Sequence, residues 1–295
     1  MKTNKIRGNV MLLITAMIWG SAFAAQSIGM NHVGPFTFQT IRCLLGSIVL
    51  LPVIRLLGSH KKMVTNAPRE NPKTLWKAGI LCGILLCTAS SLQQKGIMYT
   101  TVGKAGFITA MYILLVPLIG CLFGTKLTKR LCICIVMAVG GLYLLCMNGS
   151  FSLSKGDTYV ILCAVFFSLH ILVVDHFIDY VDGVKLSCIQ FLVTAVISSI
   201  PMFVLESPNI HGILLAGVSI LYAGILSCGV AYTLQILGQK YTEPTVASLI
   251  MSLESVFSLL SGMLILHQFP SSREVVGCIL MFTAIILVQL PERVK

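Results

Sequence analysis

One carboxylate, Glu254, lies inside the otherwise uncharged stretch SLIMSLESVFSLLSGMLIL at residues 248–266. A charged side chain at membrane depth costs about 3 kcal/mol on insertion scales, so such residues usually face a cavity or a partner. A carboxyl group can accept hydrogen bonds from a substrate and can also carry a proton. We therefore predict that Glu254 contacts substrate and is the candidate for proton coupling. A structural ion pair between helices is the alternative.

Arg42 is the second charged residue predicted at depth, about two turns into the apolar stretch at residues 35–57. Its guanidinium group suits the recognition of a substrate anion. A long side chain near a helix end can instead reach toward the membrane surface. We predict Arg42 as a binding residue and leave open whether it pairs with Glu254, which would disfavour proton coupling.

Uncharged polar and aromatic residues complete the candidate binding site. They are Trp19, Gln39, Gln94, His170, Gln190, Tyr232 and Gln235. Amides and aromatic rings around a few charges suit a small zwitterion or polar metabolite better than a lipid or a bulky cation. We expect about half of the glutamines and aromatics to touch a cavity and the others to bridge helices. His170 either lines the cavity or serves as a buried structural residue.

Asp175 and Asp179 form a DxxxD pair, which in membrane prenyltransferases holds Mg²⁺ and a diphosphate. Such enzymes need a second aspartate-rich motif, and residues 1–149 contain no aspartate. A Mg²⁺-dependent prenyltransferase-type enzyme is therefore only an alternative. We predict that the protein is not an enzyme and uses no cofactor and no metal.

The composition requires elements that cross a membrane. Only 11% of the 295 residues are charged, 56% are hydrophobic and the mean hydropathy is +0.92, whereas a soluble domain is about a quarter charged. Each apolar run has the length of a helix that crosses a ~30 Å hydrocarbon core. The sequence thus predicts an all-α polytopic membrane protein with ten spans, near residues 7–27, 35–57, 75–97, 104–124, 131–148, 158–178, 186–204, 212–237, 244–266 and 275–291.

The net charge of +11 reports topology and not a nucleic-acid partner. Numbered from a cytoplasmic N-terminus, one side of the ten spans carries 15 of the 21 lysines and arginines and the other side carries four. The positive-inside rule then places both termini in the cytoplasm and the chain in the inner (plasma) membrane. The expected partners are the lipid bilayer and a small-molecule substrate, with no nucleic acid, and both a monomer and a homodimer stay open. Ala22-Phe23-Ala24 also fits a signal-peptide cleavage site, but losing the first span would break the repeat described next.

An internal repeat relates the two halves of the chain. Residues 96–112 match residues 238–254 at a constant offset of 142, and Gly8 matches Gly156 more weakly. Tyr112 is thereby the counterpart of Glu254, and we predict that it also binds substrate. The predicted units are 1–149 and 150–295; because each has five spans, the second enters the membrane from the opposite side. Inverted repeats place a site near the midplane and favour a secondary transporter over an enzyme or a channel.

The segments LQQKGIMYTTVGKAGFITAMYILLVPLIG (92–120) and AYTLQILGQKYTEPTVASLIMSLESVF (231–257) resemble the EamA-like family of the drug/metabolite transporter (DMT) superfamily. The resemblance implies a ten-helix inverted-repeat fold and transport of amino acids, related metabolites, nucleosides or toxic compounds. Where the family often has Glu-Pro, this chain has Glu254-Ser255. We predict an exporter of a small polar metabolite, such as an amino acid or derivative, that works by alternating access. An exporter of drugs or toxic cations is the alternative.

Overall fold

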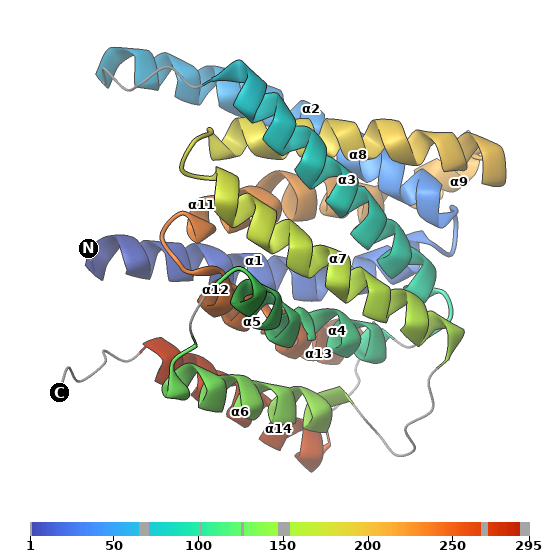
Figure 1. The fold of residues 1–295 in the computed structure, drawn as a ribbon. Coiled ribbons are helices and arrows are strands. Elements are labelled where there is room, and N and C mark those ends of the chain that lie inside the picture. The colour runs from blue at the N-terminus through green and yellow to red at the C-terminus, as the bar shows by residue number, and fades with distance from the viewer. Residues whose placement is uncertain are drawn as a thin grey trace.

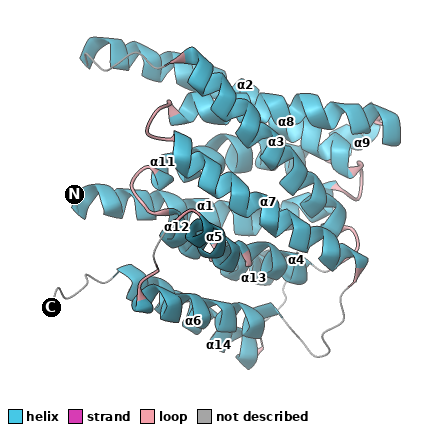
Figure 2. Cartoon of the chain, in the orientation of Figure 1, coloured by secondary structure: helices cyan, strands magenta, loops and turns pink. Residues whose placement is uncertain are grey.

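The computed structural model describes residues 2–64, 71–100, 102–124, 127–146, 154–266 and 271–289, and these residues form helices and no strand (Figure 2). The first half contains α1 (Lys2–Gly29), α2 (Pro35–Val64), α3 (Pro72–Ile97), α4 (Val102–Ala110), α5 (Tyr112–Leu122) and α6 (Lys129–Cys146). The second half contains α7 (Lys155–Phe177), α8 (Gly183–Leu205), α9 (Ile210–Leu215), α10 (Gly217–Leu221), the π-helix η1 (Tyr222–Tyr232), α11 (Thr233–Gln239), α12 (Pro244–Met251), α13 (Glu254–Leu266) and α14 (Ser272–Gln289). The predicted boundary at 149/150 lies outside the described residues.

Seven stretches of the described helices are long and apolar enough to cross a membrane. They confirm an all-helical, multi-pass membrane protein. The three predicted spans outside these seven contain α4 with α5, α6 and α14. Parts of them, Ile108–Leu122 and Val275–Leu287, are shorter apolar helices. That all ten predicted spans cross the bilayer stays a prediction.

Local sequence signals explain where several helices begin. The Asn71 side chain accepts a hydrogen bond of 3.0 Å from the Lys73 amide at the start of α3, where Pro72 occupies the first helical turn. Ser154 and Asp157 form a reciprocal capping box at the start of α7. Such caps satisfy backbone amides that have no partner within the helix, and each stabilises a helix end by about 1 kcal/mol.

Figure 1 shows α1 near the middle of the bundle, with α2 and α8 on one side and the α6–α14 pair on the other. Helix α3 packs on both α7 and α8, while α1 packs on η1, α11, α12 and α13. The backbones of α3 and α8 approach closely at Gly79 and Gly83, where an added Cβ atom would collide with Ile189 and Val193 of α8, respectively. Small residues thus allow helix backbones to approach where lipid supplies no hydrophobic drive.

Two adjacent glycines of α6 allow a matched test of this packing. A Cβ atom on Gly141 would lie 2.7 Å from the carbonyl oxygen of Gly277 and 3.1 Å from the Met281 amide, both in the backbone of α14. A Cβ atom on Gly140 would meet nothing within 4 Å. We expect Gly141→Ala to destabilise the protein by about 1–3 kcal/mol because α6 and α14 must separate. Gly140→Ala should be neutral or slightly stabilising. Thermal unfolding in detergent measures both variants, and equal midpoints would contradict this packing.

Two predicted spans are interrupted at corresponding places, which corrects the expectation of one helix over 104–124 and one over 244–266. Helix α4 gives way to α5 at Met111, and α12 gives way to α13 before Glu254. Each break contains a tight backbone hydrogen bond of 3.2 Å, from Met111 to Ile108 and from Leu253 to Ile250. Tyr112 and Glu254 therefore each begin a new helix in the interior of the bundle.

The predicted span at 212–237 also departs from a plain α-helix. Its centre, η1, is a π-helix from Tyr222 to Tyr232. π-Helical segments are rare and are frequently found at functional sites. Ser227 and Tyr232 of this segment line the pocket described below.

Candidate functional site

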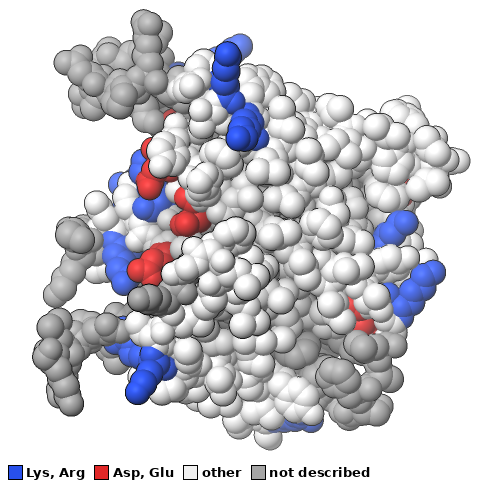
Figure 3. Space-filling view, in the orientation of Figure 1, with Lys and Arg blue, Asp and Glu red and all other residues white. Residues whose placement is uncertain are grey.

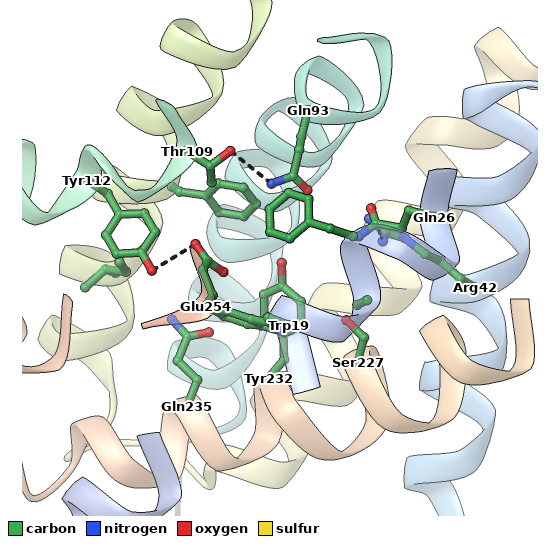
Figure 4. A pocket seen from close by; sticks show the side chains of 14 residues that line it. Trp19, Gln26, Arg42, Gln93, Thr109, Tyr112, Ser227, Tyr232, Gln235 and Glu254 are labelled. Atoms are coloured by element: carbon green, nitrogen blue, oxygen red, sulfur yellow. Dashed lines mark hydrogen bonds between the residues drawn. The ribbon is translucent and has the colours of Figure 1, made fainter. Parts of the chain in front are cut away.

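A pocket with a cavity volume of about 30 Å³ lies inside the bundle (Figure 4). That volume is enough for about one or two water molecules, so the lining side chains lie close together in this conformation. Six of the predicted site residues line it: Trp19, Arg42, Tyr112, Tyr232, Gln235 and Glu254. They come from α1, α2, α5, η1, α11 and α13, so both halves of the chain contribute.

Eight further residues line the pocket and were not predicted. Four are polar, namely Gln26, Gln93, Thr109 and Ser227, and four are apolar, namely Ala22, Phe23, Phe167 and Ile171. Gln93 is the counterpart of the predicted Gln235 at the offset of 142, so the repeat contained the signal for it. The sequence pointed instead to its neighbour Gln94.

Glu254 and Tyr112 meet directly at one side of the pocket. The Tyr112 hydroxyl donates a hydrogen bond of 3.0 Å to Glu254 Oε1, and each side chain is 3% exposed. Glu254 is the first residue of α13.

Arg42 is held by neutral amides. Its Nε and Nη2 donate to Gln39 Oε1 at 3.0 and 2.5 Å, and its Nη1 donates to Gln26 Oε1 at 3.0 Å. Behind these partners, Gln94 donates to Gln26 Oε1 at 2.7 Å, and Gln39 donates to the Ser90 hydroxyl. Gln39 and Gln94 therefore lie outside the pocket lining and position Arg42 through its neighbours.

Arg42 and Glu254 occupy different ends of the pocket. Figure 4 shows Glu254 with Tyr112 at one end and Arg42 with Gln26 at the other, with Trp19 between them. Among the described residues, the hydrogen bonds of Arg42 go to glutamines, and Glu254 accepts from Tyr112. The ion pair that the sequence left open is therefore absent between these two residues in this conformation.

Aromatic and imidazole side chains fix Tyr232 in the wall of the pocket. The Tyr232 ring lies 4.6 Å from Trp19 and 5.4 Å from Phe191, between ring centroids. His170 stacks edge-on against Tyr232 at 6.2 Å. Its Nε2 lies 2.9 Å from Gln190 Oε1, and neither His170 nor Gln190 lines the pocket. His170 thus supports the wall from behind.

Two lining residues have a buried polar atom without a protein partner: Trp19 Nε1 and Gln235 Oε1. Gln235 uses its amide nitrogen to donate to Gln239 Oε1 at 3.1 Å, so its oxygen stays free to accept. Buried polar atoms are nearly always hydrogen-bonded in native proteins. An unpaired donor and an unpaired acceptor in one pocket indicate a site for a polar ligand.

Asp175 lies in the last turn of α7, and Asp179 follows just after that helix, at the end predicted to face the cytoplasm. Neither residue lines this pocket. Among the described residues, no group of three or more His, Cys, Asp or Glu side chains is placed to hold a metal ion. Within the described part of the chain, Asp175 and Asp179 thus do not belong to such a group.

Long apolar helices around a polar pocket define a multi-pass membrane protein. One crystal structure of another protein has this fold, with a TM-score of 0.79 at 18% identity, covering 96% of this chain and 98% of that chain. The model of the EamA-like transporter family matches residues 6–147 and again residues 154–290. The chain belongs to this family.

Two relatives carry the name "uncharacterized transporter". One, from Archaeoglobus fulgidus, is 28% identical over 280 residues, which cover 95% of this chain and 84% of the relative. The other, from Clostridium kluyveri, is 23% identical over 289 residues, which cover 92% of this chain and 90% of the relative. Family and relatives together identify a membrane transporter.

Proposed function

We propose that the protein is a secondary transporter that exports a small polar metabolite, such as an amino acid or derivative, by alternating access. The observation that carries this proposal is the pocket, which buries Arg42 and Glu254 and leaves two polar atoms without a partner. Charged residues at membrane depth usually mark a substrate or ion pathway. Proton coupling would run through Glu254, because its carboxyl group can exchange a proton with substrate or water when the pocket opens.

Ten spans in two inverted five-helix repeats would supply the moving parts. The two matches of one family model, at residues 6–147 and 154–290, support this division. Equivalent residues also make equivalent contacts. A Cβ atom on Gly8 would lie 2.9 Å from the Gly238 carbonyl oxygen, and one on Gly156 would lie 2.8 Å from the Gly96 carbonyl oxygen. Both contacts join a helix of one half to a helix of the other.

The same two places each have a hydrogen bond between the halves, which we call the latches. The first latch joins Thr242 Oγ1 to Asn9 Oδ1 at 3.1 Å, and the second joins Thr100 Oγ1 to Asp157 Oδ1 at 2.8 Å. The beginnings of α1 and α7, which carry Asn9 and Asp157, point to opposite ends of the bundle (Figure 1). In the proposed cycle, the latches would open in turn, so that the pocket faces one side of the membrane at a time.

We place the chain in the plasma membrane with both termini in the cytoplasm. The bias of lysine and arginine toward one set of loops supports this orientation. Figure 3 shows the charged side chains on the viewed face near the two ends of the bundle, with a wide uncharged band between them. Such a band matches the hydrocarbon core of a bilayer.

Flux through the purified protein in proteoliposomes tests this function. A thermal-shift screen of amino acids and derivatives, nucleosides and cationic drugs first selects a ligand, since a ligand at 100 times its Kd stabilises a protein by about 2.7 kcal/mol. We expect uptake of that ligand to saturate and to accelerate when unlabelled ligand is placed on the opposite side. Flux that rises linearly with concentration and ignores the opposite side would indicate a channel and contradict a carrier.

A further inference from the structure

We propose that the substrate is an extended zwitterion, with an anionic group at one end that binds Arg42 and an ammonium group at the other end that binds Glu254. This inference rests on the proposed function and specifies the ligand of the same pocket. It separates substrates whose charges are far apart, such as ω-amino acids, from α-amino acids, whose two charged groups share one carbon atom.

The Arg42 end lacks a negative charge. Arg42 is 4% exposed, and its three hydrogen bonds go to the amide oxygens of Gln39 and Gln26. A guanidinium group has five N–H donors, so two remain for a ligand. No carboxylate among the described residues forms an ion pair with it, and a buried charge without a counter-ion is strongly unfavourable. An anionic group of the substrate would supply the missing charge and use the two remaining donors.

At the Glu254 end, the pocket offers more hydrogen-bond acceptors than donors. Tyr112 donates to one carboxylate oxygen of Glu254, and Gln235 Oε1 has no partner. Figure 4 shows Gln235 and Glu254 on the same side of the pocket. A substrate ammonium group has three N–H donors and carries the complementary charge. It would satisfy the Glu254 carboxylate and the Gln235 oxygen together.

Aromatic residues lie between the two ends. Trp19 and Tyr232 pack at 4.6 Å between ring centroids and line the pocket together with Phe23 and Phe167. The chain thus presents a positive end, a middle lined by aromatic rings together with the polar Gln93, Thr109 and Ser227, and a negative end. A substrate that matches this order has its charges at the two tips.

Binding of a graded ligand series to the full-length protein in detergent tests the inference. The series is glycine, β-alanine, γ-aminobutyrate, δ-aminovalerate and ε-aminocaproate, in which only the separation of the two charges changes. We expect affinity to rise with separation and to reach an optimum at least about tenfold above glycine, which corresponds to about 1.4 kcal/mol. The α-amino isomer of aminovalerate, with the same atoms but adjacent charges, is the matched control and should bind weakly.

Two half-ligands identify which end binds which charge. Valerate lacks the ammonium group of δ-aminovalerate, and pentylamine lacks the carboxylate. We expect Arg42→Gln to weaken valerate and δ-aminovalerate and to leave pentylamine unchanged. Glu254→Gln should weaken pentylamine and δ-aminovalerate and leave valerate unchanged. Thermal unfolding without ligand confirms that each variant is folded.

Several results would overturn the inference. They are equal affinity for the α- and ω-isomers, equal loss of both half-ligands in one variant, or binding by none of these probes. The transporter proposal is judged separately, by saturable and trans-accelerated flux of the ligand found in the wider screen. A nucleoside or a cationic drug that shows such flux would therefore preserve the transporter proposal while rejecting an extended zwitterion.

Discussion

Replacing Glu254 by glutamine should abolish accumulation of substrate driven by a pH gradient, while the protein stays folded. Glutamine has nearly the same shape, and its amide oxygen can still accept the hydrogen bond that Tyr112 donates at 3.0 Å. It cannot carry a proton or a negative charge. Because hydrogen bonds to charged groups contribute about 1.5–3 kcal/mol, we expect substrate binding to weaken by roughly 10- to 100-fold.

Tyr112→Phe is the matched control for Glu254→Gln. It removes the same hydrogen bond but keeps the carboxyl group, so we expect a smaller loss of transport and an unchanged dependence on the pH gradient. Proteoliposomes with an imposed pH gradient measure accumulation, and thermal unfolding measures folding. Wild-type accumulation by Glu254→Gln, with the same response to pH, would show that this carboxyl group is not the coupling residue.

Much of the fold could be predicted from the sequence because the membrane imposes its own length scale on apolar segments. The helix breaks could not. Neither Met111 nor the pair Ser252-Leu253 is a proline or glycine, so propensity gave no warning. The breaks occur where α4 and α5 cross α13 and α12, and such a crossing depends on tertiary packing. The π-helix η1 likewise has no local sequence signal that separates it from an α-helix.

The charged residues of the site were predictable from their cost at membrane depth, whereas the roles of the glutamines were not. Gln93 lines the pocket, but its neighbour Gln94 faces Gln26. Which of these two neighbouring glutamines faces the pocket depends on the rotation of α3 about its axis. Helix α3 is apolar on several sides, so no polar face fixes that rotation in advance. Gln39 was predicted to bind substrate, and only the structure shows that it accepts hydrogen bonds from Arg42 outside the pocket lining.

Covalently closing either latch should stop turnover. The double variants Asn9→Cys with Thr242→Cys, and Thr100→Cys with Asp157→Cys, place two thiols where side chains now form hydrogen bonds of 3.1 and 2.8 Å. A disulfide at either place would prevent that end of the bundle from opening. Because a carrier must open both ends in each cycle, we expect each cross-link to abolish flux almost completely.

Reduction and single variants control for damage from the substitutions. Reductant should restore flux in both double variants, and each single cysteine variant should be insensitive to oxidant. Asp157→Cys also removes part of the capping box of α7, which lowers stability by about 1 kcal/mol, so thermal unfolding should accompany the flux measurement. Full flux through a protein with a closed disulfide would show that this end does not open during transport.

Access to the pocket from each side of the membrane tests the central claim most directly. Ser227 lines the pocket and is 3% exposed. In a background without the native cysteines, Ser227→Cys can be exposed to a membrane-impermeant thiol reagent added on one side at a time. We expect labelling from both sides in the uncrosslinked protein. The disulfide between cysteines at positions 9 and 242 should remove labelling from one side only. The disulfide between cysteines at positions 100 and 157 should remove labelling from the other side. Labelling from a single side in the uncrosslinked protein would contradict alternating access.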